Sequence, residues 1–423
     1  MTDAPLPGRE RPRIAVFFAL GTLGTVPGLQ DALLMLTENG YTVDLFVRGE
    51  ARFPDPEFGD APVSVFADRP GIFGRGPTTQ PGWLRERGGR PYSWIVRRTY
   101  HPAWRSLVFR RELSARHRHA PYHCIIALDS QALVDSAGYA VDLGVPVVFW
   151  SLELIFWSQI RSESVLRLKE REVRCSRDAA LVIVQDPWRG AALVTENGLD
   201  PARVVYVPNA PRGSARRRRS SFLQETLGLD PVRRVVLCAG AIEPWAMSLD
   251  LVRAASRWPS GFTLVLQSRS DVRSAASAYV RAVLGEASPD HVAVLTEPLS
   301  PSDFRALVDS ADVGLALYDP RRGDPAGDLD RNIELMGYAS GKIASYLQGG
   351  LPIVVNSLPG PRDLIAQHGC GRCADSPEDV AVALADIFAD YERYVRDACQ
   401  CFDQQLELER HFAPVVGRIM ALR

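Results

Sequence analysis

The stretch RIAVFFALGTLGTVPGLQDALLMLTENGYTVDLFV, residues 13–47, decides the fold. It begins with an unbroken apolar run at 13–20, which suits a strand that is buried on both faces of a parallel sheet. A glycine-containing loop, a segment with helical spacing at 29–40 and a second apolar run at 41–47 follow. This order of strand, loop, helix and strand is the repeating unit of doubly wound α/β sheets, and we predict that fold class.

The loop after the first apolar run contains Gly21, Gly24 and Gly28. Their spacing differs from the GxGxxG fingerprint of dinucleotide-binding folds, and Pro27 interrupts the pattern. The sequence therefore gives only weak support for a nicotinamide, and we expect no cofactor.

The alternation of strands and helices continues along the chain in two series, which predicts two Rossmann-like domains facing each other across a cleft. We place the first domain at 1–211, a linker at 212–231, the second domain at 232–402 and a C-terminal helix at 403–423. Packing of that helix against the first domain is left open. The linker contains four consecutive arginines, for which an exposed face and a nucleic-acid-binding segment are the alternatives; we favour the exposed face.

Composition excludes several classes of function. The 423 residues carry 49 Lys and Arg against 50 Asp and Glu, so no overall basic field favours nucleic acid, and we expect no nucleic-acid partner. No apolar run approaches the roughly 20 residues of a membrane span, and the first residues lack an apolar signal region. The seven cysteines are an odd number in apolar contexts, as expected for reduced thiols. We predict a cytoplasmic protein, with peripheral contact to the inner face of a membrane left open.

Four of the cysteines cluster near the end of the chain. Cys370 and Cys373 form a CxxC pair, and Cys399 and Cys401 follow. A four-thiolate zinc site is one interpretation, but the second pair is tightly spaced and QHGCGRCADS is typical of a turn after a helix. We expect incidental thiols and no metal.

Residues 51–123 carry a poorer periodic signal and are rich in Pro, Gly, Arg and aromatic residues. One interpretation is a long surface excursion with an amphipathic helix behind it. The other is a surface for the acceptor or for a membrane, because basic and aromatic residues together suit phosphate-bearing or lipid-linked ligands.

A second informative stretch is GYASGKIASYLQGGLPIVVN, residues 337–356. Small residues including Ser340 and Gly341 precede Lys342 and a segment with helical spacing, and a Gly-Gly-Leu-Pro turn leads into a short apolar strand. A helix amino terminus presents unpaired N–H groups and a partial positive charge, so it binds phosphate, and the lysine adds a full cation. A lysine that merely solvates a surface helix is the alternative.

The same stretch resembles the nucleotide-sugar signature of bacterial GT-B glycosyltransferases of the group 1, retaining, family 4-like type. VYVPNAP is similar to the strand end that closes the first domain of that family, and DVGLALYDP is similar to the strand before its donor loop. The resemblance implies that the second domain holds a nucleoside diphosphate sugar and the first an acceptor hydroxyl. It also implies retention of configuration. Because no Asp-x-Asp pair stands at a strand end, we predict transfer without a metal ion.

The resemblance implies donor-binding roles for the amides of Ser340 and Gly341, for Lys342, and for the loop after the first strand of the second domain. That loop contains Gly240, Ala241 and Ile242. Two features depart from the family: the loop reads GAIEPWAM without the usual basic pair, and Gly337 and Ser345 stand at the positions of two common glutamates. We expect Ser345 to hydrogen-bond a ribose hydroxyl.

Five further polar residues are candidates. Asn332 and Glu334 either meet sugar hydroxyls or belong to a solvated loop. Glu243 either faces the sugar as a catalytic residue or caps the next helix. Glu153, between aromatics after a strand, suits a raised pKa and deprotonation of an acceptor, or else binds a backbone amide. Asp129 ends a strand at the expected edge of the cleft.

On the acceptor side we place Gly24 and Thr25 in the first glycine loop and His101 in TYHPAW, for which a structural role is the alternative. The predicted function is transfer of a sugar from a nucleoside diphosphate sugar to a hydroxyl of a glycan, a lipid-linked acceptor or a small molecule. The alternatives are a non-catalytic binding or partner subunit and a nucleotide-sugar epimerase.

Overall fold

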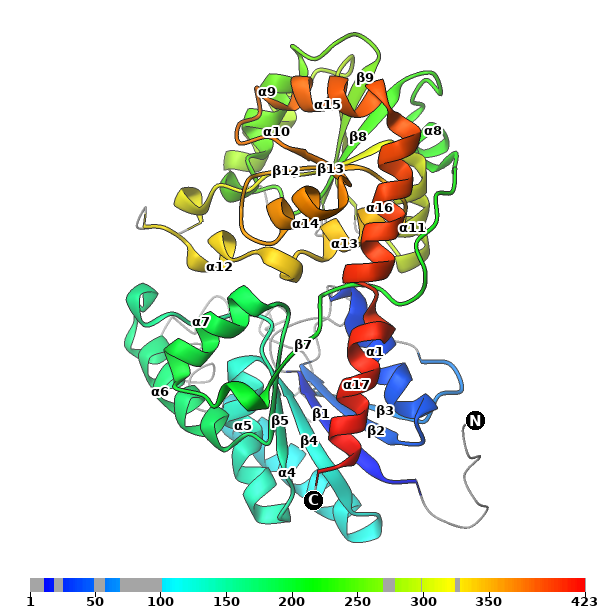
Figure 1. Ribbon diagram of the computed structural model, residues 1–423. Helices are drawn as coiled ribbons and strands as arrows, with labels where there is room; N and C mark the ends of the chain where they lie inside the picture. Colours follow the sequence, from blue (N-terminus) through cyan, green and yellow to red (C-terminus); the bar gives the residue numbers. More distant parts are fainter. Residues whose placement is uncertain are drawn as a thin grey trace, which may run out of the picture.

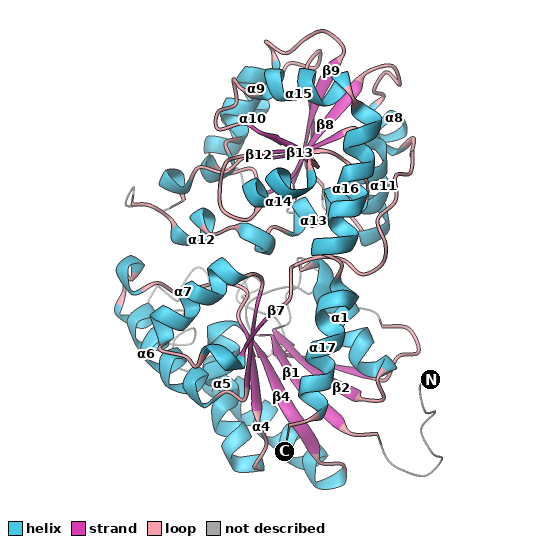
Figure 2. Cartoon of the chain, in the orientation of Figure 1, coloured by secondary structure: helices cyan, strands magenta, loops and turns pink. Residues whose placement is uncertain are grey.

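The computed structural model describes residues 11–18, 26–48, 58–68, 101–268, 278–297, 299–323 and 328–422. The chain forms two lobes, and each lobe is a parallel sheet with helices on both of its faces (Figures 1 and 2). The predicted pair of Rossmann-like α/β domains is therefore confirmed.

The first sheet has the strand order β3-β2-β1-β4-β5-β6-β7. Its strands are β1 (Arg13–Phe18), β2 (Thr42–Arg48), β3 (Val63–Asp68), β4 (Tyr122–Leu128), β5 (Val147–Trp150), β6 (Leu181–Val184) and β7 (Val204–Tyr206). Successive residues of β1 enter two different cores: Ile14 and Val16 pack on one face, and Ala15 and Phe17 on the other. Burial on both faces explains why this strand is apolar throughout.

The helices of the first lobe are α1 (Pro27–Glu38), α4 (His101–His119), α5 (Asp129–Leu143), α6 (Glu163–Asp178) and α7 (Pro187–Asn197). The excursion predicted at 51–123 is wrong in one part. Val63–Asp68 is an edge strand that pairs in parallel with β2, and its described side chains are only half-buried, so the apolar signal is weak. Helix α4 lies behind it as expected, and residues 69–100 lie outside the described residues.

The second sheet has the order β10-β9-β8-β11-β12-β13. Its strands are β8 (Arg234–Gly240), β9 (Phe262–Ser268), β10 (Val292–Leu295), β11 (Val313–Ala316), β12 (Ile353–Val355) and β13 (Gly371–Cys373). The turn predicted for QHGCGRCADS is present at Gly369, which has a φ of +65° and ends the helix Pro361–His368, but strand β13 follows it directly. An added Cβ at Gly371 would lie 2.0 Å from the Ile353 carbonyl oxygen, so the glycine that resembled a turn residue permits close strand pairing.

The helices of the second lobe are α8 (Phe222–Leu227), α9 (Ser248–Ala255), α10 (Ala278–Glu286), α11 (Pro301–Ser310), α12 (Arg331–Glu334), α13 (Gly341–Gln348), α14 (Pro361–His368), α15 (Val380–Ala389) and α16 (Tyr391–Gln405). The final helix, α17 (Leu408–Met420), belongs to the first lobe (Figure 1). Its Phe412 ring stacks on Trp150 at 5.5 Å between centroids. The chain thus crosses between the lobes twice, after β7 and again between α16 and α17.

The arginine-rich segment predicted as an exposed linker lies on the second lobe. Arg219 donates to the carboxylate of Asp312 at 2.7 Å, and Arg217 donates to the Ala311 carbonyl. Leu223 of α8 is fully buried in the second core. Arg216, Arg218 and Arg219 are exposed, as predicted, and Arg217 is half-buried. Nothing in their spacing indicates the contacts with Asp312 and Ala311.

Among the helices that the structure describes, none combines the length and the apolar character needed to cross a membrane.

Candidate functional site

Strand order reverses in the second sheet between β8 and β11, and ligands of open α/β sheets bind at such a point. Strand β8 ends at Gly240, which has a φ of +121°, and an added Cβ there would lie 3.7 Å from Lys342 Nζ. The same Nζ lies 4.8 Å from the centroid of the Tyr318 ring, just beyond the end of β11. The fold therefore brings two of the predicted donor-site residues together at the switch point of the sheet.

Helix α13 holds Lys342 in this place through Tyr346. The Tyr346 ring packs on Gly314 of β11, where an added Cβ would lie only 2.2 Å from a ring carbon. Its hydroxyl accepts a hydrogen bond of 2.7 Å from the Ala239 N–H, one residue before Gly240. The helix is thus fixed against both strands that border the switch point.

Lys342 is a cation in a costly position. It is 7% exposed, and no carboxylate forms an ion pair with it anywhere in the described parts of the chain. Its described charge contact is the face of the Tyr318 ring. Because a buried charge without a counter-charge is unfavourable, the site is suited to an anionic ligand.

The choice of lysine at 342 is itself informative. The sequence contains two lysines, Lys169 and Lys342, and the rest of its 49 Lys and Arg residues are arginines. Lys169 pairs with Glu172 in the interior of the first lobe at 3.0 Å. An ammonium is a compact point charge, whereas a guanidinium is a wide planar group, so the cation beside Gly240 and Tyr318 is of the compact kind.

The start of α13 supplies the amides that the sequence predicted. Gly341 and Lys342 are the first residues of the helix, so their N–H groups have no partner within it. Ser340 is 6% exposed, and its hydroxyl shares a 2.8 Å hydrogen bond with the hydroxyl of Tyr318 rather than capping the helix. The helix end is consequently left to another acceptor.

Sequence reasoning missed the aromatic pair beside this cation. Tyr318 stacks on Trp245 with 6.0 Å between centroids and 19° between planes. The Tyr318 N–H donates to the side chain of Asn356, which directly follows β12. The signal that was available is position, since both Tyr318 and Asn356 come just after strands whose carboxyl ends meet at one edge.

In the loop after β8, the residues that follow Gly240 differ in their exposure to solvent. Ile242 is buried in the second core, and Ala241 is half-buried. Glu243 is exposed and precedes the short turn Pro244–Ala246 without a capping hydrogen bond from its side chain. Its predicted placement in the cleft stays a prediction.

Three donor-side candidates from α12 and α13 lie close to the loop but differ in their contacts. The Ser345 hydroxyl donates to the Gly341 carbonyl at 2.8 Å and keeps its acceptor capacity. Asn332 exchanges two hydrogen bonds with the backbone of Leu154 in the first lobe, at 3.0 and 2.7 Å. Glu334 is half-buried. Their roles toward a sugar stay predictions.

The acceptor-side carboxylates lie at the edge of the first sheet. Asp129 begins α5 with a φ of 66° and is 8% exposed. Its Oδ1 accepts from the N–H groups of Leu152 and Glu153, at 2.7 and 3.0 Å. Burial raises the pKa of Asp129 to about 7, although these two hydrogen bonds and Arg189 lower it. Asp129 therefore fixes the loop that carries Glu153.

Glu153 lies between the two lobes. Its side chain is 75% exposed, and one carboxylate oxygen is 3.8 Å from an Arg189 nitrogen. Desolvation by the two lobes around it raises the pKa of Glu153, the charge of Arg189 lowers it, and the charge of Asp330 in the second lobe raises it further. An accessible carboxylate with a raised pKa is suited to accept a proton.

The remaining acceptor-side predictions fall at the margin of the structure. Gly24 and Thr25 lie outside the described residues. His101 is the first residue of α4, and only its backbone is described.

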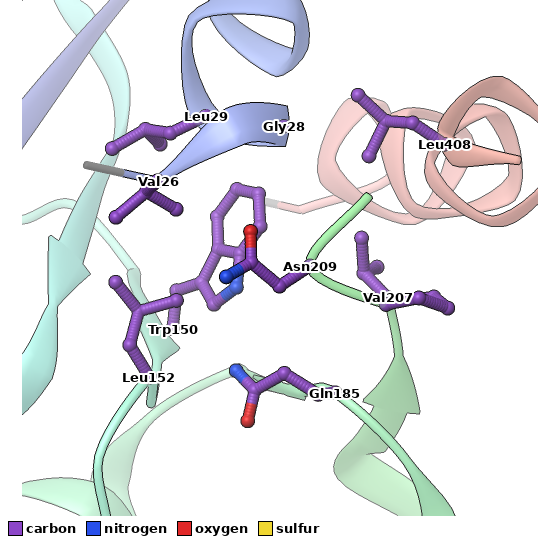
Figure 3. Close-up of a pocket in the computed structure, with 10 residues that line it drawn as sticks. Val26, Gly28, Leu29, Trp150, Leu152, Gln185, Val207, Asn209 and Leu408 are labelled. Carbon is purple, nitrogen blue, oxygen red and sulfur yellow. The ribbon is translucent and has the colours of Figure 1, made fainter. Parts of the chain in front are cut away.

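A small pocket adjoins the start of α1 at the carboxyl edge of the first sheet (Figure 3). Its cavity is about 10 Å³, room for roughly one water molecule. Trp150 Nε1 and Asn209 Oδ1, from two of the lining residues, are buried and have no hydrogen-bond partner among the residues that the structure describes. Trp150, Asn209 and Leu408 of α17 thus border one space where the chain crosses between the lobes.

Cys370 and Cys401 are buried, and Cys373 is exposed. No cluster of three or more His, Cys, Asp or Glu side chains suited to a metal ion occurs within the described ranges.

No protein-family model matches the sequence, and no curated protein matches it. Solved structures do match over nearly the whole chain. A sucrose-phosphate synthase from Thermosynechococcus elongatus is 16% identical, with a TM-score of 0.68, and the match covers 97% of this chain and 98% of that chain. Anabaena HepE, solved with UDP and glucose, is 14% identical with a TM-score of 0.62 and the same coverage.

An α,α-trehalose-phosphate synthase (UDP-forming) from Burkholderia vietnamiensis is 14% identical, with a TM-score of 0.60 and coverage of 97% and 98%. At these identities the likeness concerns the fold. The chain has the GT-B fold that these glycosyltransferases share.

Proposed function

We propose that the protein transfers a sugar from a nucleoside diphosphate sugar to a hydroxyl acceptor. The observation that carries the proposal is the buried, unpaired Lys342 at the start of α13, beside Gly240 at the switch point of the second sheet. The structural neighbours support it, because each of those named above is a sugar-transferring enzyme or was solved with UDP.

The donor diphosphate is proposed to bind between the first amides of α13 and the Lys342 ammonium. As the bond to the sugar breaks, negative charge grows on the leaving diphosphate, and both groups stabilise it in place without reorganisation. Helix amides and one lysine supply this stabilisation in our proposal, so the transfer needs no metal. Retention of configuration follows from the sequence resemblance.

The acceptor hydroxyl is proposed to approach from the first lobe, at Glu153. A base with a raised pKa holds the acceptor proton more effectively near neutral pH than an ordinary carboxylate does. The fixed loop at 152–153, held by Asp129, keeps that carboxylate between the lobes.

The test uses UDP as the probe, in titration calorimetry on the full chain. Lys342→Ala removes a charge-assisted contact and is expected to weaken UDP binding about 10- to 100-fold. Lys342→Arg is the charge-preserving control and is expected to retain more UDP affinity than Lys342→Ala, because its charge still attracts the diphosphate although a guanidinium differs in shape from an ammonium. Without ligand, Lys342→Ala should be at least as stable as the wild type, since an unpaired buried charge is removed.

A panel of nucleotide sugars with and without acceptors then separates the candidate functions. Sugar transfer to any hydroxyl acceptor supports the proposal, an epimer formed from donor alone indicates an epimerase, and tight binding without turnover indicates a binding subunit. The proposal fails if no nucleoside diphosphate binds and Lys342→Ala changes nothing.

A further inference from the structure

The first turn of α7, in the first lobe, grips the segment of the second lobe that leads into Lys342. We call Asp186, Trp188 and Arg189 the α7 clamp. In Figure 1 the start of α7 lies at the surface of the first lobe that faces α12 of the second. Of these three residues, only Arg189 belongs to the site described above, where it lies beside Glu153.

Asp186 makes the central contact. Its side chain is fully buried, and each of its two carboxylate oxygens accepts a hydrogen bond from a different lobe. Oδ1 accepts from the Arg189 N–H at 2.8 Å, which caps α7, and Oδ2 accepts from the Tyr338 N–H at 2.9 Å across the interface. A buried carboxylate is retained at an interface only when both oxygens are satisfied in this way.

Two glycines of the second lobe fit closely against the clamp. Gly337 has a φ of +44°, and an added Cβ there would lie 2.2 Å from Asp186 Oδ2. Gly360 has a φ of +88°, and its added Cβ would lie 2.8 Å from the Gly337 Cα and 3.5 Å from the Trp188 ring. Gly337 is one of the two positions where the resembling family carries glutamate, and here a side chain would displace the carboxylate of Asp186.

Trp188 and Arg189 extend the grip to either side. The Trp188 ring meets the Tyr338 ring edge to face at 5.7 Å. Arg189, 1% exposed, donates to the Leu152 carbonyl at 2.6 Å in the acceptor-side loop and to the Leu335 carbonyl at 3.2 Å in the second lobe. One arginine therefore touches both sides of the interface.

Asn209, where the chain crosses between the lobes, completes the hold on Tyr338. Its backbone N–H donates to the Tyr338 carbonyl at 2.9 Å, and its side-chain amide donates to the Ala339 carbonyl at 3.1 Å. The residues directly before Ser340 are thus held by hydrogen bonds that all originate outside the second sheet.

We propose that the α7 clamp sets the conformation of the donor loop, with Asp186 as its positioning residue, so that affinity for the diphosphate in the second lobe depends on the first lobe. The inference rests on the proposed function. A loop that is already ordered presents its amides to the diphosphate at no further cost. A loop that becomes ordered only on binding costs conformational entropy, and this cost lowers the affinity for the ligand. Donor therefore binds most tightly when the two lobes are docked through the α7 clamp.

The test compares two buried carboxylates of the first lobe. Asp186→Asn keeps the shape, but its amide N–H must face the N–H of either Arg189 or Tyr338, so one of the two contacts is lost. Asp44→Asn is the matched control, because Asp44 is also fully buried and accepts from the Tyr122 hydroxyl at 2.6 Å, far in the fold from Tyr338. We expect Asp186→Asn to weaken UDP binding about tenfold, and Asp44→Asn to lower stability while leaving UDP affinity unchanged within about twofold.

Hydrogen exchange of the 333–347 backbone without ligand supplies a second readout. We expect faster exchange in Asp186→Asn and wild-type exchange in Asp44→Asn. If Asp186→Asn does not fold, Asn209→Ala removes the bond to Ala339 and is expected to act in the same direction.

Equal exchange and equal affinity in the two carboxylate variants would overturn the clamp while the proposed function stands. Failure of wild-type UDP binding would instead count against the proposed donor, and the exchange comparison would still decide the clamp.

Discussion

The two edges that face each other between the lobes carry opposite chemistry. The second sheet presents Lys342, a buried cation without a counter-charge among the described residues, whereas the first presents Asp129 and Glu153, carboxyl groups whose pKa values are raised. A cation is suited to a diphosphate, and a carboxylate is suited to a hydroxyl that must lose a proton. This difference fits the proposed function, in which the second lobe binds the donor and the first lobe binds the acceptor.

The largest effect is expected at Glu153, the proposed base of the first lobe. Glu153→Gln keeps the size but removes the base, and we expect turnover to fall about 10²- to 10⁴-fold with UDP affinity unchanged. In the wild type, activity should rise with pH through the raised pKa of Glu153, and the variant should lose that rise. Steady-state rates across pH with any acceptor found in the panel provide the measurement, and a variant with full activity would remove Glu153 from the mechanism.

Asp129 of the first lobe is expected to make the free energy of unfolding depend on pH. Because the folded pKa of about 7 lies above the ordinary 3.8, the folded state binds the proton more tightly than the unfolded state does. Stability is therefore greatest below pH 4 for this group and falls as pH rises from about 4 to about 7, by on the order of 4 kcal/mol.

Asp129→Asn has no proton to lose and also tolerates the left-handed φ, so its unfolding free energy should lack this fall. Urea unfolding of both proteins at pH 5 and pH 8 gives the measurement. A wild type and a variant with parallel pH profiles would contradict the linkage.

Gly314 tests the donor edge alone. Gly314→Ala adds a Cβ that would lie 2.2 Å from the Tyr346 ring, and we expect a loss of about 2 kcal/mol together with weaker UDP binding as α13 shifts. Gly138→Ala is the matched control, because an added Cβ there meets nothing within 4 Å. Thermal unfolding and calorimetry on both variants are sufficient, and equal behaviour would show that the fit of α13 on β11 does not govern the site.

Much of the fold could be predicted because its signal is local. Strands such as β1 are buried on both faces and read as unbroken apolar runs, and β8 gives the same pattern in the second lobe. Two of the four edge strands, β3 and β13, were missed, because the described side chains of β3 are only half-buried and β13 is a Gly-Arg-Cys segment with two exposed positions.

The candidate site was predictable in part for the same reason. Gly240 and Lys342 belong to motifs at the ends of strands or the start of a helix, where local sequence indicates a site. Tyr318 and Asp186 also follow strand ends, but nothing local indicates their partners Ser340 and Tyr338, which lie 22 and 152 residues away in the chain.

By itself the sequence determined two doubly wound α/β domains and a lysine at a helix start, because periodicity and glycine spacing act within a few residues. Only the tertiary structure decided that Lys342 lies unpaired against Gly240 and Tyr318, and that Asp186 occupies the space beside Gly337. These arrangements depend on strand order and on how the lobes dock, and burial and charge pairing are properties of neighbours in space rather than of neighbours in sequence.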